Sequence, residues 1–103
     1  MDRPTFVRLL RTPTSERFLL QLAERDVAVL DLHYLGDHTV QASLLVYEGA
    51  GITEPEIPAL LERIDEILLP EVRLDDKTLT FSVAMGRVVG AYEAARDNLP
   101  PAP

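Results

Sequence analysis

The chain has 103 residues, no cysteine and a net charge of −7. Its length fits one domain, and its 47% hydrophobic and 26% charged residues are ordinary for a folded globular protein. These values exclude a wholly disordered chain, a disulfide scaffold and a thiolate zinc site. The acidic balance also argues against nucleic-acid binding, because a phosphate backbone is bound by clustered positive charge.

We expect three regions along the chain. Residues 1–12 form a basic N-terminal arm whose pattern fits neither a strand nor a helix well. Residues 13–97 form the single domain, and the proline-rich residues 98–103 form an extended tail. No apolar run approaches the roughly 18 residues of a membrane span, and arginines interrupt the apolar residues of the arm. We therefore expect a cytoplasmic protein that does not enter a membrane.

The first predicted helix covers residues 14–25. Thr12 and Pro13 resemble an N-cap followed by a proline at the first helical position. A helix here would place Glu16 on its solvated side. Its apolar stripe would consist of Phe18, Leu19, Leu22 and Ala23.

Two runs rich in β-branched and aliphatic residues, 27–34 and 39–47, predict a β-hairpin. The register that pairs Leu30 with Leu44 makes one face apolar except for the hydroxyl of Tyr34, and burial favours that register. The opposite face is polar near the turn and apolar at its far end. We expect a helix or another chain to cover the apolar end. Its members are Val27, Val29, Leu45 and Tyr47.

The strongest amphipathic pattern predicts a helix from about Ile57 to Leu68, preceded by Thr53 and Glu56 at the spacing of a capping box. Beyond it, residues 72–74 and 78–85 predict a second hairpin. The last segment divides between strand and helix, and we adopt a helix over 88–97. The resulting order, α-β-β-α-β-β-α, predicts an α+β fold. In that fold, two β-hairpins form a mainly antiparallel sheet with helices packed on one face.

The two histidines suggest one candidate polar site. Asp31 and His33 share a face of one predicted strand, and His38 lies at the adjacent turn. Such a group can hold a divalent metal or orient a general base. The ordinary interpretation is a solvated strand end, and we adopt it. The chain also lacks a cysteine nucleophile and a serine elbow motif. We therefore predict no catalytic, metal-binding or cofactor-binding residue.

Without a catalytic set, the sequence favours a non-enzymatic protein-interaction module of the adaptor, chaperone or inhibitor kind. We expect a homodimer whose interface is the apolar end of the hairpin, formed by Val27, Val29, Leu45 and Tyr47. The acidic surface would steer a basic protein partner, and we expect neither nucleic acid nor a membrane as a partner. The alternative is a small-molecule-binding regulatory domain with its ligand at the Asp31 and His33 end.

Overall fold

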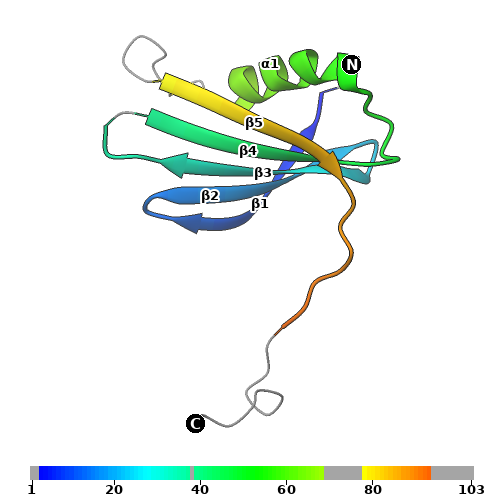
Figure 1. Ribbon diagram of the computed structural model, residues 1–103, viewed down its shortest axis with the longest axis horizontal. Helices are drawn as coiled ribbons and strands as arrows, with labels where there is room; N and C mark the ends of the chain where they lie inside the picture. Colours follow the sequence, from blue (N-terminus) through cyan, green and yellow to red (C-terminus); the bar gives the residue numbers. More distant parts are fainter. Residues whose placement is uncertain (1–2, 38, 69–77, 94–103) are drawn as a thin grey trace, which may run out of the picture.

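A five-stranded sheet and one α-helix make up the part of the chain that the computed structural model describes, residues 3–37, 39–68 and 78–93 (Figure 1). The elements are β1 (Thr5–Thr12), β2 (Ser15–Leu22), β3 (Arg25–Tyr34), β4 (Thr39–Tyr47), the 3₁₀ turn η1 (Glu54–Glu56), α1 (Ile57–Leu68) and β5 (Thr78–Gly86). The strand order is β1-β2-β3-β4-β5. Neighbours from β1 to β4 are antiparallel, whereas β5 joins β4 in parallel. The sheet is therefore mixed.

The predicted order of elements is wrong in three places. Residues 14–25 form β2 and its turn instead of a helix, and the basic arm supplies the edge strand β1. Residues 78–86 pair with β4 instead of closing a hairpin with residues 72–74, which lie outside the described residues. The helix expected over 88–97 is absent from its described part, since residues 87–93 form neither helix nor strand. In the described residues, the predicted α+β arrangement of three helices and two hairpins is thus replaced by a sheet with one α-helix.

The chain from Ser15 to Leu22 is a strand because its side chains alternate between the two faces of the sheet. It then reverses through Ala23 and Glu24, whose φ angles are 50° and 66°. Two successive left-handed residues are the geometry of a tight hairpin turn, which usually employs Gly, Asn or Asp. Neither residue belongs to that group, so the sequence contains no turn signal at this point.

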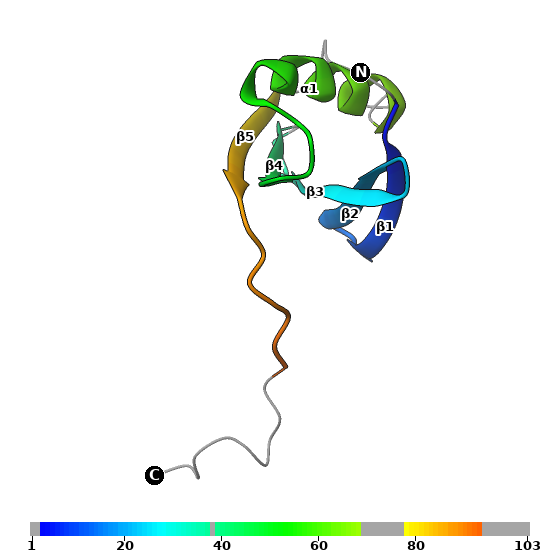
Figure 2. The same cartoon turned by 90° about the vertical axis from the view of Figure 1, so that its right-hand side faces the viewer.

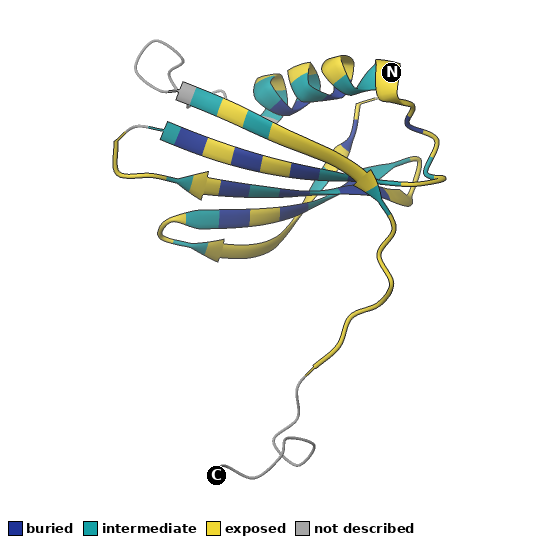
Figure 3. Ribbon diagram, in the orientation of Figure 1, coloured by how far each residue is buried: buried dark blue, intermediate teal, exposed yellow. Residues whose placement is uncertain are grey.

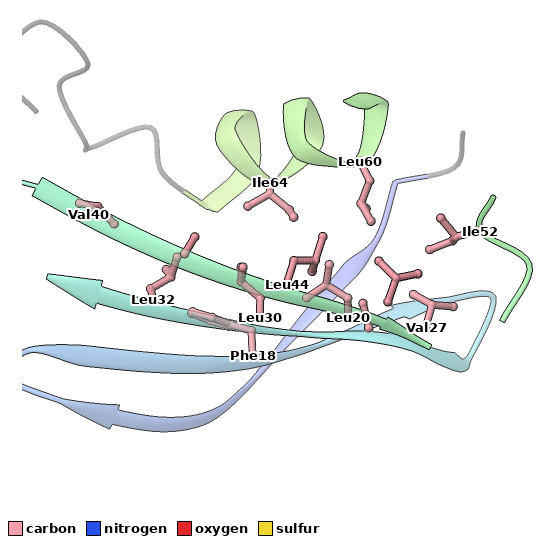
Figure 4. Close-up of a cluster of buried hydrophobic side chains, with 13 residues drawn as sticks. Phe18, Leu20, Val27, Leu30, Leu32, Val40, Leu44, Ile52, Leu60 and Ile64 are labelled. Atoms are coloured by element: carbon pink, nitrogen blue, oxygen red, sulfur yellow. The ribbon is translucent and has the colours of Figure 1, made fainter. Parts of the chain in front are cut away.

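The predicted hairpin of β3 and β4 is confirmed together with its register, in which Leu30 pairs with Leu44. The predicted helix is also confirmed as α1, which lies across one face of the sheet. Leu60 and Ile64 of α1 are fully buried and point toward the strands (Figure 4). Parallel strands need a crossover connection, and α1 lies within the connection between β4 and β5. The core fills the space between helix and sheet. Its sheet residues include Phe18, Leu20, Ala28, Leu30, Leu32, Val40, Ala42, Leu44 and Val46.

The capping box that the sequence predicted stands at the start of η1, which leads directly into α1. The Glu56 carboxylate accepts hydrogen bonds from the Thr53 backbone N–H at 3.0 Å and from the Thr53 hydroxyl at 2.8 Å. These bonds favour the charged form and lower the pKa of Glu56. Pro58 is tolerated because it is the second residue of α1, where its missing N–H has no helical partner.

The described elements cover one side of the curved sheet. α1 lies on the concave side, and no described element lies over the opposite side, which we call the open face (Figure 2). Buried and exposed residues alternate along β4 in consequence (Figure 3). Among the described helices, none is long and apolar enough to cross a membrane.

Candidate functional site

A row of uncharged apolar side chains crosses the open face from one edge strand to the other. Successive members are paired across neighbouring strands, so the row runs across all five strands. We call it the apolar row: Val7, Leu19, Val29, Leu45 and Ala84. Its three central members are half-buried by their neighbours, and its two end members are exposed. Monomeric proteins seldom leave a continuous apolar strip of this kind uncovered.

The apolar row contains two of the four residues predicted as an interface. Val29 and Leu45 lie at its centre, and Tyr47 lies two residues beyond Leu45 on the same face of β4. Val27 does not belong to this surface, because it is fully buried. A β-bulge in the pairing of β2 with β3 leaves Val27 and Ala28 both inside the core. Three members of the row became neighbours of Val29 and Leu45 only through the strand order: Val7, Leu19 and Ala84.

An ion pair flanks the apolar row. Nε of Arg17 donates to Oδ1 of Asp31 at 2.7 Å, and Nη2 donates to Oδ2 at 3.2 Å. The hydrogen bond to Asp31 and the charge of that carboxylate raise the pKa of Arg17. Arg17 and Asp31 face each other because β2 and β3 place them in register. The two charges compensate each other, so they leave no net charge beside the row.

Two of the three residues of the candidate polar site, Asp31 and His33, lie within the described residues. The Asp31 carboxylate is engaged by Arg17, and His33 is an exposed residue paired with Gln41 across the sheet. His38 lies outside the described residues. Within residues 3–37, 39–68 and 78–93, no three side chains of His, Cys, Asp or Glu are placed to hold a metal ion. The geometry therefore favours the apolar row over this polar group as the functional surface.

A second polar cluster, which the sequence did not predict, lies on the concave side at the β1 edge. We call it the Glu16 cluster. Glu16 is only 8% exposed, although the predicted helix placed it in solvent. The hydroxyl of Tyr34 donates a hydrogen bond to its Oε2, and Arg8 approaches its Oε1 at 3.1 Å. Arg11 lies 3.7 Å from the same oxygen. The only sequence signal for this contact was the single hydroxyl on an otherwise apolar face.

Arg8 also closes the edge of the core. Its guanidinium lies 5.5 Å from the centre of the Phe18 ring, and the Phe6 and Phe18 rings meet edge to face at 6.3 Å. An arginine can cover apolar surface with its stem and aromatic face contacts while its charge remains in water. At the β1 edge, the Glu16 cluster therefore covers the part of the core that contains Phe18.

The environment of Tyr34 predicts a specific pH dependence. Burial, followed by the hydrogen bond to Glu16, raises the pKa of Tyr34 to about 12 from the ordinary value of about 10. The folded state therefore retains a proton that the unfolded chain releases. This contribution to stability is complete below pH about 10 and is lost as the pH rises through about 12.

We expect the stability difference between the wild type and Tyr34→Phe to shrink across pH 10–12, the range set by the raised pKa of Tyr34 of about 12 and its ordinary value of about 10. Urea unfolding at several pH values measures that difference, and ultraviolet absorbance of the phenolates follows the titration directly. The folded wild type should contain one phenol, absent from Tyr34→Phe, that titrates near pH 12. A difference spectrum that appears near pH 10 would contradict the assignment.

Comparison of the chain with protein-family models, with curated proteins and with solved structures finds no match. The surface of this molecule is therefore the guide to its function. Two features of that surface are built by residues distant in sequence: the apolar row on the open face and the Glu16 cluster on the concave side. The Glu16 cluster is satisfied internally, whereas the described structure leaves the apolar row uncovered.

Proposed function

We propose that this protein is a small, non-enzymatic protein-interaction module that forms a homodimer through the open face of its sheet. The observation that carries the proposal is the apolar row, which spans five strands in register on a face that no described element covers. A sheet normally buries one face and exposes a polar one. Here the second face also carries apolar residues at its centre, which is typical of an association surface.

Charge favours a second copy of the chain as the occupant of this face. Each copy carries a net charge of −7, so two copies repel each other wherever charged surfaces meet. The apolar row carries no charge, and the flanking Arg17 and Asp31 form an ion pair. Two copies can therefore approach through this face with little repulsion. The apolar row has no excess negative charge that would attract a basic protein partner.

The row also suits twofold symmetry. The apolar row runs across the strands. A twofold axis parallel to the row therefore pairs each of its residues with the same residue of the second copy. This arrangement brings Val29 against Val29 and Ala84 against Ala84, with the two β5 edges together. α1 then faces outward on both sides of the dimer. Its outward acidic residues can steer a basic protein partner: Glu62 and Asp65, beside Glu66, which forms an ion pair with Arg63.

The double variant Val29→Glu with Leu45→Glu tests the dimer. Val29 and Leu45 are paired across β3 and β4, so a dimer would bring four like charges together at its centre. Like charges in an interface cost several kcal/mol, which corresponds to a loss of affinity of about a hundredfold or more. We expect native mass spectrometry and sedimentation velocity to show a wild-type dimer and a monomeric variant with the wild-type circular dichroism spectrum.

The matched control is Leu35→Glu with Ala59→Glu. It adds the same charge at two exposed positions. Leu35 lies after β3, six residues or about 20 Å along the strand from Val29, and Ala59 lies on α1. The control should remain dimeric, because both positions lie away from the proposed interface. A wild-type monomer, or a Val29→Glu/Leu45→Glu variant that dimerises like the wild type, would refute the proposal.

A further inference from the structure

The chain leaves the sheet after β5 as an extended arm that carries large apolar side chains. The sheet ends where the Glu48 N–H donates to the Gly86 carbonyl at 2.7 Å. Beyond that bond, residues 87–93 form neither helix nor strand, and every one of them is exposed. Val89 is 79% exposed and Tyr92 is 86% exposed. We call residues 87–93 the C-terminal arm.

An apolar groove lies on the concave side of the sheet, between β5 and the beginning of α1. Val83 and Met85 form its floor from β5, and they remain 37% and 41% exposed although the residues beside them on β4 are buried. Ile57 and Pro58 form the helical wall, and Glu54 also lines the groove. The core thus ends in an open apolar site beside the Glu54 carboxylate.

We propose that the two features belong together: in the dimer, the C-terminal arm of each copy crosses to the other copy and places Tyr92 in its groove. This inference rests on the proposed dimer. It adds a second contact between the two copies, beside the apolar row. A tyrosine ring packs well against methionine sulfur and a proline ring, which Met85 and Pro58 supply. The hydroxyl needs a polar partner at the mouth of an apolar site, and the Glu54 carboxylate can accept its hydrogen bond.

The direction of the arm favours the partner's groove over its own. The arm leaves the end of β5 on the side of the open face, away from α1 (Figure 2). The groove lies on the side of α1, because Ile57 and Pro58 line it. Its own Tyr92 would have to reverse direction within six residues. In one copy the groove is open and Tyr92 is exposed. A second copy on the open face lies in the path of the arm.

The length of the arm is sufficient. From Gly86 to Tyr92 an extended chain spans about 20 Å, whereas two sheets packed face to face lie about 10 Å apart. A twofold axis along the apolar row puts the two β5 edges together, so the arm passes the partner's edge strand and reaches the groove behind it. The groove and the open face are thereby joined into one continuous interface.

Cysteine cross-linking tests this exchange directly, because the chain has no cysteine of its own. Two single-cysteine chains, Tyr92→Cys and Met85→Cys, are given tags of different mass, mixed, unfolded and refolded together, and oxidised gently. A disulfide requires Cα atoms within about 7 Å. We expect the mixed disulfide to exceed either symmetric disulfide by at least about fivefold. Leu35→Cys in place of Met85→Cys is the control and should give no such excess.

The outcomes separate the arm from the dimer. The double variant Tyr92→Cys with Met85→Cys should form a covalent dimer, and a bridge within one chain would overturn the exchange in favour of an arm that folds back. A wild-type dimer without an excess of the mixed disulfide would overturn the exchange and leave the dimer intact. A mixed disulfide that persists with Val29→Glu and Leu45→Glu present would support the exchange but refute the open-face interface.

Discussion

Leu44→Ala is expected to destabilise the protein by about 2–5 kcal/mol, whereas Leu45→Ala should cost about 1 kcal/mol in the monomer. The two residues are neighbours on β4, but Leu44 is 1% exposed beneath α1 and Leu45 lies in the apolar row on the open face. Truncation of Leu44 leaves a cavity in a close-packed core. The same chemical change therefore has different costs because adjacent strand residues face opposite sides.

Urea unfolding followed by circular dichroism measures both losses through the shift of the midpoint at an unchanged slope. In a thermal scan, a loss of 2 kcal/mol lowers the Tm by about 8 °C or more for a domain of this size. The loss caused by Leu45→Ala should increase with protein concentration if the open face dimerises, because association stabilises the folded state. Equal losses for the two variants at low concentration would contradict the assignment of the faces.

Glu16→Ala is the second substitution with a large expected effect, about 1.5–3 kcal/mol. It leaves the part-buried Tyr34 hydroxyl without its acceptor and removes the carboxylate shared by Arg8 and Arg11. The two arginines are more than half exposed, so water compensates them and the loss stays below that of a fully buried ion pair. Glu62→Ala on the exposed side of α1 is the matched control and should change stability by less than about 0.5 kcal/mol.

A double-mutant cycle of Glu16→Ala with Tyr34→Phe isolates their hydrogen bond. Because each single variant breaks the same contact, the double variant should lose less stability than the sum of the two. Moderate salt should weaken the effect of Glu16→Ala only in part, since screening acts on the exposed arginines and not on the contact with Tyr34. Additive losses would show that Glu16 and Tyr34 do not act on each other.

Two elements could be predicted from sequence because their signals are local. The helix over 57–68 has apolar residues at helical spacing and a capping box at its start, and both features lie within one short segment. The register of the β3–β4 hairpin follows from burial, because a slip of one residue would turn Leu30 and Leu44 out of the core. Val29 and Leu45 were placed on the opposite face by the same alternation.

The error over residues 14–25 has a physical cause. Leu19, Leu22 and Ala23 complete an apparent helical stripe, but Leu19 lies on the open face and the turn at Ala23 contains no residue that signals it. Hydrogen bonds to β1 and β3 on either side hold residues 15–22 in the β conformation. Tertiary pairing outweighs a weak local preference in such a segment.

The acidity of the chain, its lack of cysteine, one amphipathic helix and a hairpin with one apolar face follow from the sequence alone, because they depend on composition and on neighbours along the chain. Which distant residues meet depends on the three-dimensional fold. Strand order aligned Val7, Leu19 and Ala84 with Val29 and Leu45. The fold also places the C-terminal arm at the end of β5, and it brings Arg8 and Tyr34 to Glu16. Such contacts depend on pairing between strands, and no local period in the sequence encodes them.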